Sequence, residues 1–487
     1  MNDFASFLEK SKSANVIPVV ETLAADLLTP LAVYLKLAGE AENSFLLESV
    51  EGGESLARFS FIGVDPVFVA TGNDEQVSIT DKNGTQKIST PMIEFLREHF
   101  AKYKVYEDGS LPSFIGGAIG TMNFSCSAWF EPSVKSELEK PENESTFMFF
   151  RSIIAFDHVK QIIQIVSLVI MDEGVSENEF DAARKTNLEI RKTLESGELV
   201  LPQNNSGVSV EPSSSNWEKE KFENAVCKIK EMINAGDAYQ VVISQCFRKP
   251  TNTAPVAIYR AIRSLNPSPY MFLIKVGERS IIGASPEMLV RVRGRDLEYR
   301  PIAGTRPRGK TPDEDQILAN EMRADRKEVA EHLMLVDLGR NDLGRVAEYG
   351  SVKVDGLMSV EKYSHVQHLV SYLSAKLRDG LDRFDALAAC FPAGTVSGAP
   401  KVRAIEIIQS LEPTERGIYA GAVGYFDYAG NMDTCIAIRT MTLENGIAIL
   451  QAGAGIVADS VPETEFQETL NKAAAMLRAI EIAENSF

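Results

Sequence analysis

The sequence predicts an α+β fold in which antiparallel sheets and helices occupy separate stretches of a 487-residue chain. Two sets of short β-rich segments support this prediction, one at 271–302 and one at 420–455, and glycine-containing turns separate the segments within each set. Helical periodicity appears before, between and after the two sets. Strands and helices in separate stretches are typical of α+β proteins, whereas βαβ units would place a helix after each strand.

Periodicity defines the elements at the start of this region. Apolar residues recur at helical spacing from Phe222 to Ile233 and Gly236 supplies a stop, so we expect a helix over 217–235. The β-rich runs that follow, within 271–302, predict an antiparallel meander. Their sequences are MFLIKV, SIIGA, MLVRV and LEYRPI.

Cap and turn signals define the later elements. Thr311-Pro312-Asp313-Glu314 combines a capping box with proline at the first helical position, which predicts the start of a helix. In the second β-rich set, YAGN and LENG are typical hairpin turns. The last helix follows Pro462 and is expected to bury Phe466, Leu470, Ala473, Leu477 and Ile480.

The chain is too long for one ordinary core. Proline, asparagine, serine and glycine replace the apolar periodicity at 201–216. We therefore expect an N-terminal lobe over 1–200, a linker over 201–216 and a second domain over 217–487. Two lobes that share one large sheet system are compatible with the same length.

Charge and cysteine content limit the macromolecular partners and the cellular compartment that we expect for this protein. The formal net charge of −18 argues against nucleic acid or an anionic membrane as the main partner, because a negative surface repels polyphosphate. The five cysteines are scattered and form no C-x-x-C pair, which fits a reducing cytoplasm better than a disulfide framework or a zinc site. The N-terminus has no signal-peptide pattern, and the longest apolar run, IIQIVSLVIM, is too short to cross a bilayer. We expect a cytoplasmic protein.

Two helices carry carboxylates that suit a magnesium ion. In the last helix, Glu465 and Glu468 are three residues apart and share one side, and Mg²⁺ prefers oxygen ligands. The alternative is a solvated face on which Lys472 pairs with Glu468. In the middle helix, Glu331 lies beside an apolar run, either as a ligand or as a rim charge paired with basic neighbours.

Two further clusters concern anions and proton transfer. Arg306, Arg308 and Lys310 surround a Gly-Thr pair in PIAGTRPRGK, which is either a solvated turn or a loop that holds an anion. His365 and His368 are three residues apart. Without a carboxylate or cysteine at ligand spacing, one reactive histidine is favoured over a metal pair.

Glycine-rich loops at 391–401 and 451–460 present backbone N–H groups that can approach an anion, or they serve tight packing. Neither matches a P-loop or dinucleotide fingerprint. No nucleophile motif such as G-x-S-x-G is present. The residues alone predict an α+β protein with anion-binding loops and a candidate magnesium site, and they do not reach a substrate.

Seven motifs occur in the order found in the chorismate-utilising enzymes, and the chain resembles this family over nearly its whole length. Within the family it is most similar to the large, synthase components of anthranilate synthases. The resemblance implies a two-lobed complex α/β sandwich of antiparallel sheets and helices, with the active site between the sheet layers. The motifs are PIAGTRPRG, EHLMLVDLGRNDLGR, YSHVQHLVS, FPAGTVSGAPK, GAVGY, AIRT and GAGIVADS followed by E-x-x-E.

The resemblance also implies an activity, the Mg²⁺-dependent lyase conversion of chorismate and ammonia to anthranilate and pyruvate, inhibited by L-tryptophan. Gln240 stands where members that add water have a lysine base, and Ala303 stands where many aminodeoxychorismate synthases have a lysine that attacks the ring. LLESV at 46–50 and NPSPYMF at 266–272 match the tryptophan feedback elements. No glutaminase domain follows the last helix, so a separate glutamine amidotransferase subunit is expected to supply the ammonia.

The family's functional residues carry over as expectations. Glu287 corresponds to the general acid, His368 to a residue that assists the later steps, and Arg306 and Arg308 are expected to support the substrate loop. The catalytic set is Glu287, His368, Gln240 and Thr395. The substrate-binding set is Gly304, Thr305, Tyr419, Arg439, Gly453, Ala454 and Gly455. The magnesium ligands are Glu331 and Glu468, with Glu465 close by, and the feedback set is Glu48, Ser49, Pro269, Tyr270, Met271 and Cys435.

Three alternatives remain open from the sequence. The nearest is aminodeoxychorismate synthase component I, against which Ala303 and the LLES motif argue. An isochorismate or salicylate synthase is less favoured because of Gln240. A catalytically silent, tryptophan-binding partner of a glutaminase is the third, and the intact Glu287 and His368 argue against it.

Overall fold

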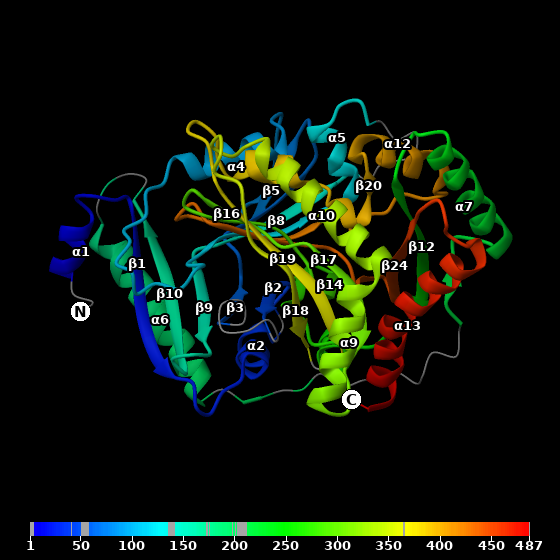
Figure 1. The fold of residues 1–487 in the computed structure, drawn as a ribbon. Helices are drawn as coiled ribbons and strands as arrows, with labels where there is room; N and C mark the ends of the chain where they lie inside the picture. The colour runs from blue at the N-terminus through cyan, green and yellow to red at the C-terminus, as the bar shows by residue number, and fades with distance from the viewer. Residues whose placement is uncertain are drawn as a thin grey trace.

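Two large antiparallel sheets form the centre of the molecule (Figure 1). The structure, a computed structural model, describes residues 4–39, 41–49, 58–134, 142–171, 174, 176–196, 198–199, 201, 212–363 and 366–486. His365 and most of the expected linker lie outside these residues. The described part of the chain confirms the α+β class, because 12 strands contribute to each sheet and helices cover them.

The first sheet runs in the order β1-β10-β9-β3-β2-β13-β14-β23-β24-β12-β11, and β20 pairs with β12. Its strands are β1 (Val16–Ala24), β2 (Asn43–Glu48), β3 (Phe59–Val64), β9 (Ser152–Asp157), β10 (Ile162–Ile170), β11 (Ser214–Ser215), β12 (Gln240–Pro250), β13 (Tyr270–Val276), β14 (Arg279–Ser285), β20 (Gly398–Ala399), β23 (Thr440–Glu444) and β24 (Ile447–Ile456).

The second sheet runs in the order β17-β19-β16-β15-β22-β21-β7-β8-β4-β5-β6, and β18 pairs with β19. Its strands are β4 (Phe68–Gly72), β5 (Val77–Asp81), β6 (Gly84–Ile88), β7 (Gly117–Met122), β8 (Ser145–Phe150), β15 (Met288–Arg293), β16 (Asp296–Tyr299), β17 (Ile302–Pro307), β18 (Lys353–Lys362), β19 (Val366–Lys376), β21 (Ala422–Asp427) and β22 (Met432–Ile436).

The helices pack around the two sheets. In the first half of the chain they are α1 (Phe4–Lys10), α2 (Pro30–Ala38), α4 (Met92–Ala101), α5 (Ser127–Phe130) and α6 (Glu177–Ser196), with the 3₁₀ turn η1 (Phe124–Cys126). In the second half they are α7 (Lys219–Asn234), α8 (Pro255–Leu265), α9 (Pro312–Ala324), α10 (Arg326–Gly344), α11 (Arg383–Cys390), α12 (Lys401–Leu411) and α13 (Pro462–Ser486), with η2 (Gly394–Val396). No helix among the described residues is both long and apolar enough to span a membrane.

Both regions of the chain, before and after 201–216, contribute to each sheet. Strand β2 pairs with β13 in the first sheet, and β7 pairs with β21 in the second. The main hydrophobic core lies between the sheets and includes Phe45 and Ile119. A second core lies between the first sheet and the helices α2, α8 and α13. Figure 1 shows α6 over β1 and β10 at one end and α13 beside β24 at the other.

The expected meander at 271–302 is wrong in its connectivity. Strands β13 and β14 pair as a hairpin in the first sheet, but β15 and β16 pair in the second sheet. The chain passes from one sheet to the other through Pro286 and Glu287. The LEYRPI run is also broken, because Arg300 and Pro301 separate β16 from β17, and both strands pair with β19.

The predicted hairpins in the second β-rich set are confirmed, and they too lie in different sheets. Strands β21 and β22 meet at the YAGN turn, and β23 and β24 meet at LENG. At the second turn, Asn445 and Gly446 both have positive φ, 52° and 71°. Two consecutive left-handed residues are typical of a type I′ turn, which matches the twist of the flanking strands.

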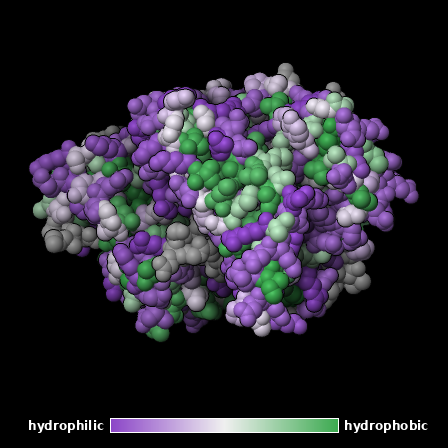
Figure 2. All heavy atoms as spheres, in the orientation of Figure 1, coloured by the Kyte–Doolittle hydropathy of each residue, from purple (hydrophilic) through white to green (hydrophobic). Residues whose placement is uncertain are grey.

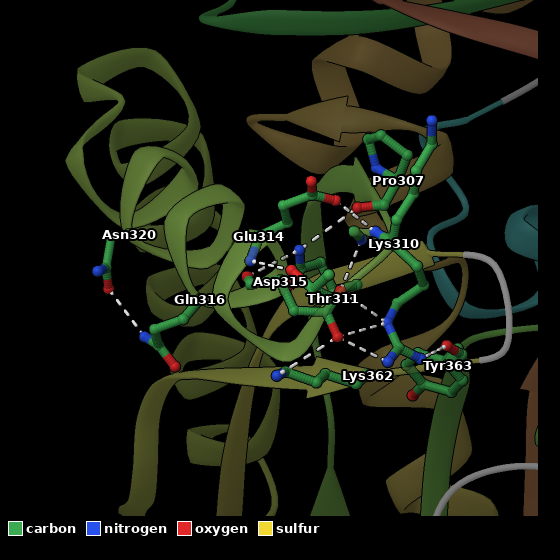
Figure 3. Close-up of polar contacts among 12 residues, drawn as sticks. Pro307, Lys310, Thr311, Glu314, Asp315, Gln316, Asn320, Lys362 and Tyr363 are labelled. Carbon is green, nitrogen blue, oxygen red and sulfur yellow. Dashed lines mark hydrogen bonds and ion pairs between the residues drawn. The ribbon is translucent and has the colours of Figure 1, made fainter.

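The predicted helix starts are largely confirmed. Helix α7 spans Lys219–Asn234, close to the expected 217–235. Thr311 caps α9 by accepting a hydrogen bond from the Glu314 backbone N–H at 3.2 Å. The Glu314 carboxylate accepts from the N–H of Lys310, not from that of Thr311, so the capping box is displaced by one residue (Figure 3).

Helix α13 buries a wider face than expected. Ala473 and Ile480 are buried, whereas the larger predicted residues Phe466, Leu470 and Leu477 are half-buried against the two cores. The helix contacts α7, α8 and β24. Contacts on several sides broaden the buried stripe and bring Glu465 into it, at 8% exposure.

The surface is mostly polar on the face seen in Figure 2. Hydrophilic side chains cover most of this face, and hydrophobic residues gather near its centre. This distribution agrees with the charged fraction of 24% and the net charge of −18.

Candidate active site

A cavity of about 330 Å³ lies where the two sheets, α10 and α13 meet. It brings together residues far apart in the chain, which supports the expected location between the sheet layers. All the predicted catalytic and metal residues line it, and so do all the predicted substrate-binding residues except Ala454. They are Gln240, Glu287, Gly304, Thr305, Glu331, His368, Thr395, Tyr419, Arg439, Gly453, Gly455, Glu465 and Glu468.

Two chain crossovers between the sheets position the ends of this cavity. Glu287 lies on the segment that leads from β14 to β15, and Arg439 lies on the segment that leads from β22 to β23. The segments are antiparallel neighbours, because the N–H of Ala284 donates to the carbonyl of Arg439 at 3.1 Å. Arg439 has a φ of +50°, which L-residues rarely adopt. Such strain at a cavity wall is typical of functional sites.

Glu287 is a buried carboxylic acid. Its side chain is 5% exposed, and burial raises its pKa to about 8. The Thr395 side chain and the backbone of Ile302 act against this shift. The Thr395 Oγ1 nevertheless has no hydrogen-bond partner of good geometry among the described residues, so it remains available to a ligand. Glu287 can therefore stay protonated at neutral pH, as a general acid must.

A glycine bulge places the histidine. The β17–β19 register shifts between Ala303 and Thr305, so Gly304 is the extra residue, with a φ of +64°. His368 Nδ1 lies 3.0 Å from both the Gly304 carbonyl oxygen and the Thr305 Oγ1. Burial lowers the pKa of His368, and Arg439 and Arg300 lower it further. The imidazole is therefore neutral at neutral pH and can accept a proton.

The cationic loop behind this bulge is structural, as expected. Arg306 donates to Glu328 at 3.0 Å and to Asp325 at 3.1 Å, which ties β17 to α10. Arg308 forms a two-pronged pair with Asp315 of α9, and Figure 3 shows Lys362 approaching the same carboxylate. Hydrogen bonds from Arg308 and the backbone of Gly309 hold the pKa of Asp315 well below its usual range. The guanidinium groups of Arg306 and Arg308 are therefore neutralised within the protein and do not reach for a ligand.

Arg439 is different, because no carboxylate lies within ion-pair distance of it in the described part of the chain. Burial lowers its pKa, and the nearby Tyr419 opposes this effect. A desolvated guanidinium without a counterion favours an anionic ligand. Arg439 is therefore the cation of this cavity best placed to receive a carboxylate.

Strand β24 passes close to Tyr419 and Gln240 because it lacks side chains at Gly453 and Gly455. A Cβ added at Gly453 would lie 2.6 Å from the Tyr419 Oη, and one added at Gly455 would lie 2.4 Å from the Gln240 Nε2. Ala454 points the other way, into the main core, so only its backbone is near the site. The alternation of a strand explains why this middle residue is not part of the wall.

Three carboxylates form the opposite rim. Burial raises the pKa of both Glu331 and Glu465, and the charge of Glu468 contributes to each shift. Glu468 pairs with Lys472 at 2.6 Å, which is the alternative weighed from the sequence. Within the described ranges, no three histidine, cysteine or acidic side chains converge as a ready metal cluster. Carboxylates this close together still suit a divalent cation, which removes their repulsion.

A second cavity has the whole predicted feedback set in its lining. Its lining includes Glu48, Ser49, Pro269, Tyr270, Met271 and Cys435. Glu48 accepts hydrogen bonds from the Tyr259 hydroxyl at 2.5 Å and lies 3.2 Å from the Arg263 Nε. Ser49 Oγ is buried with no hydrogen-bond partner among the described residues.

The second cavity also contains an ion-paired network. Arg291 Nε donates to Asp433 at 2.7 Å, and the Tyr270 hydroxyl donates to the same carboxylate at 3.0 Å. Aromatic rings, among them Phe59 and Tyr425, complete the wall. An apolar cavity with aromatic walls and fixed carboxylates suits a ligand that carries an ammonium group and an aromatic side chain.

Sequence reasoning missed several residues at these sites. Lys327 and Gln451 line the first cavity, and Arg291 and Asp433 line the second. Gln451 begins the glycine-rich loop 451–460, but the pattern of that loop assigned it no role, and the other three lie outside the motifs singled out. Only the pairing of β15 with β22 brings Arg291 and Asp433 together, and the periodicity of a strand does not specify its partner.

Comparisons with known proteins agree with this geometry. The family model described as chorismate binding enzyme matches residues 42–478. "Anthranilate synthase component 1" of Acetivibrio thermocellus is 44% identical over 484 residues, which cover 97% of this chain and 97% of that protein. The protein of the same name from Pseudomonas aeruginosa is 43% identical over 486 residues, with 97% of each chain covered.

Solved structures share the same fold. The crystal structure of anthranilate synthase component I from Streptococcus pneumoniae TIGR4 has a TM-score of 0.75 and 37% identity, covering 94% of this chain and 99% of that one. MenF, the menaquinone-specific isochorismate synthase of Escherichia coli, has a TM-score of 0.70 at 20% identity, covering 98% of each chain. At that identity the second likeness concerns the fold alone.

Proposed function

Because this chain belongs to the chorismate-binding enzyme family, we propose that it is the synthase component of an anthranilate synthase. The reaction is the conversion of chorismate and ammonia to anthranilate and pyruvate. The observation that carries the proposal is that one cavity with a carboxylate rim holds a buried acid, Glu287, and the guanidinium of Arg439, which no described carboxylate pairs. Chorismate is a dianion with a hydroxyl to be expelled, so it needs both groups.

The two anionic ends of chorismate require different partners. Arg439 receives the carboxylate of the enolpyruvyl side chain, and the Tyr419 hydroxyl and the bare backbone of Gly453 and Gly455 lie beside it. The ring carboxylate faces the acidic rim, which repels it unless a divalent cation intervenes. Glu331 and Glu468, with Glu465 nearby, are the residues that would hold Mg²⁺. Bound there, the ion supplies charge neutralisation for the ring carboxylate.

Glu287 and His368 divide the proton transfers. A hydroxyl is a poor leaving group, so Glu287 gives its proton to the ring hydroxyl as ammonia adds to the ring. The raised pKa keeps that proton available at neutral pH. The neutral His368, oriented by Gly304 and Thr305, assists the loss of pyruvate that makes the ring aromatic.

Two neutral residues favour ammonia as the nucleophile over water or a lysine amine of the protein. Gln240 is 5% exposed at the start of β12 and cannot act as the base that water addition requires. Ala303 lines the cavity and offers no amine to attack the ring. Ammonia needs no such activation, and we propose that a separate glutaminase subunit delivers it.

We also propose that L-tryptophan binds the second cavity. The carboxylate of Glu48 matches the ammonium of that amino acid, and the surrounding aromatic rings match its indole. The proposal gives a ligand to the buried hydroxyl of Ser49, which has no hydrogen-bond partner in the described part of the chain.

The test uses the purified chain with chorismate, Mg²⁺ and excess ammonium at mildly alkaline pH, and follows anthranilate fluorescence with and without L-tryptophan. Anthranilate formation that tryptophan suppresses is the expected result. An aminated product that retains its enolpyruvyl group would instead assign the chain to aminodeoxychorismate synthases. Absence of any Mg²⁺-dependent product would refute the catalytic proposal.

A further inference from the structure

The two crossovers that carry Glu287 and Arg439 are joined by one buried serine. Ser285, the last residue of β14, is fully buried at 0% exposure. Its hydroxyl donates to the carbonyl of Ile436 at 2.7 Å, across the gap between the crossovers. The backbone N–H of Glu287 approaches the same Oγ at 3.4 Å, and the carbonyl of Glu287 accepts from the N–H of Ile436 at 3.1 Å.

These contacts fix the backbones of Glu287 and Arg439, two residues whose side chains line the cavity. Glu287 is held on one side by Ser285 and on the other by Ile436. Arg439 follows Ile436 by three residues, and its carbonyl accepts from the N–H of Ala284, next to Ser285. The position of the acid relative to the guanidinium thus depends on five hydrogen-bond contacts, and the Ser285 hydroxyl takes part in three of them.

The sheets alone do not fix this position. The β14–β23 ladder ends at Gly283 and Thr440, and the β15–β22 ladder begins at Met288 and Cys435, with a shift after Met288. Between these ends both segments change sheets and form no regular ladder. A residue that bridges them at this point controls geometry that regular pairing leaves undetermined.

We propose that Ser285 is a positioning residue of the reaction, which holds the Glu287 carboxyl at its working distance from the Arg439 guanidinium. The inference rests on the proposed function, in which Glu287 is the acid and Arg439 the carboxylate anchor. Ser285 does not itself line the cavity, so it acts through the backbone of the crossovers.

The test compares Ser285→Ala with Ser280→Ala. Ser280 is also a buried serine of β14, at 2% exposure, but it lies at the far end of the strand in the regular ladder with β23. Removing the Ser285 hydroxyl leaves the Ile436 carbonyl without its side-chain donor. The crossover then loosens and water reaches Glu287.

For Ser285→Ala we expect kcat to fall about tenfold and the KM for chorismate to rise, because a misplaced acid and a misplaced anchor affect both constants. We also expect the alkaline limb of the pH profile to move toward lower pH by about one unit, because hydration lowers the pKa of a buried carboxyl. Ser280→Ala should leave the limb and the KM unchanged. Ser285→Cys replaces the hydroxyl by a somewhat larger thiol that is a weaker donor, and it should resemble the alanine variant.

An unmoved pH limb in Ser285→Ala and Ser285→Cys, with kcat within twofold of the parent, would overturn the inference. Equal effects of the Ser285 and Ser280 substitutions would overturn it too, since these would indicate a general loss of stability. If Ser285→Ala does not fold, the cysteine variant alone decides between these outcomes. A parent protein that makes no anthranilate would instead refute the proposed function, so the two failures are distinguishable.

Discussion

Ionisation of Glu287 should set the alkaline limit of turnover. A general acid works in its protonated form, so activity is present below its pKa and is lost as the pH rises through that value. With a pKa of about 8, the carboxyl is about nine-tenths protonated at pH 7 and about one-tenth protonated at pH 9. Turnover should therefore fall about tenfold between these two pH values.

The assay must separate this effect from the nucleophile. Ammonium releases more free ammonia as the pH rises, which would hide the loss of acid. We would therefore hold the free ammonia concentration constant at each pH, saturate with chorismate and Mg²⁺, and measure initial rates of anthranilate formation. Thermal unfolding at each pH would exclude a loss of folded protein as the cause.

Glu287→Gln provides the matched variant, because it keeps the shape and removes the proton. We expect it to lose a factor of about 10² to 10⁴ in kcat, the usual contribution of a general acid. Its remaining activity should show no limb near pH 8. A parent profile that stays flat from pH 7 to 9 at constant ammonia, or a glutamine variant that keeps the limb, would refute the role of Glu287.

Three further predictions concern the metal, the feedback cavity and stability. Glu468→Gln should abolish Mg²⁺-dependent turnover, whereas Lys472→Met should lower the Mg²⁺ concentration needed for activity, because Lys472 pairs with Glu468 at 2.6 Å. Measurements of activity against Mg²⁺ concentration and of Mg²⁺ binding by calorimetry would check both variants. Unchanged turnover in Glu468→Gln would contradict the metal assignment. Ser49→Phe should raise the tryptophan concentration for half-inhibition at least about tenfold with uninhibited turnover largely intact, because the ring fills the second cavity; an unaltered inhibition curve would contradict this. Arg416→Met should cost about 3–5 kcal/mol of unfolding free energy, because it leaves the 3%-exposed carboxylate of Glu412 without its cation. The surface variant Arg403→Met should cost under about 1 kcal/mol. Equal costs in denaturant unfolding would contradict the idea that burial makes the first ion pair the more important one.

Local signals in the sequence predicted several of the elements after residue 216, whereas no individual element was predicted for residues 1–200. The spacing from Phe222 to Ile233 located α7, and the YAGN and LENG turns located two hairpins. The meander at 271–302 failed because strand periodicity does not specify which sheet a strand joins. The chain passes from the first sheet to the second at Pro286 and Glu287, and the local sequence pattern does not predict this crossover.

In the candidate site too, local motifs were predictable from the sequence, whereas contacts between distant strands were not. Motif resemblance named residues that the structure places in one cavity, but the pattern alone left Glu465 and Glu468 as an ordinary solvated helix face. Residues without a motif, such as Ser285 and Arg291, were not found, because their importance depends on pairings between distant strands. The roles of the site residues remain predictions for the experiments above.

The pairing of β2 with β13 and of β7 with β21 has a consequence for dissection of the chain. A polypeptide that begins after 201–216 would expose two bare inner strands, and unpaired strand edges promote aggregation. Such a fragment should therefore be insoluble by itself. Co-expressed with its missing counterpart, it should instead reassemble by strand complementation, and the recovered activity would report how completely each interrupted ladder has closed.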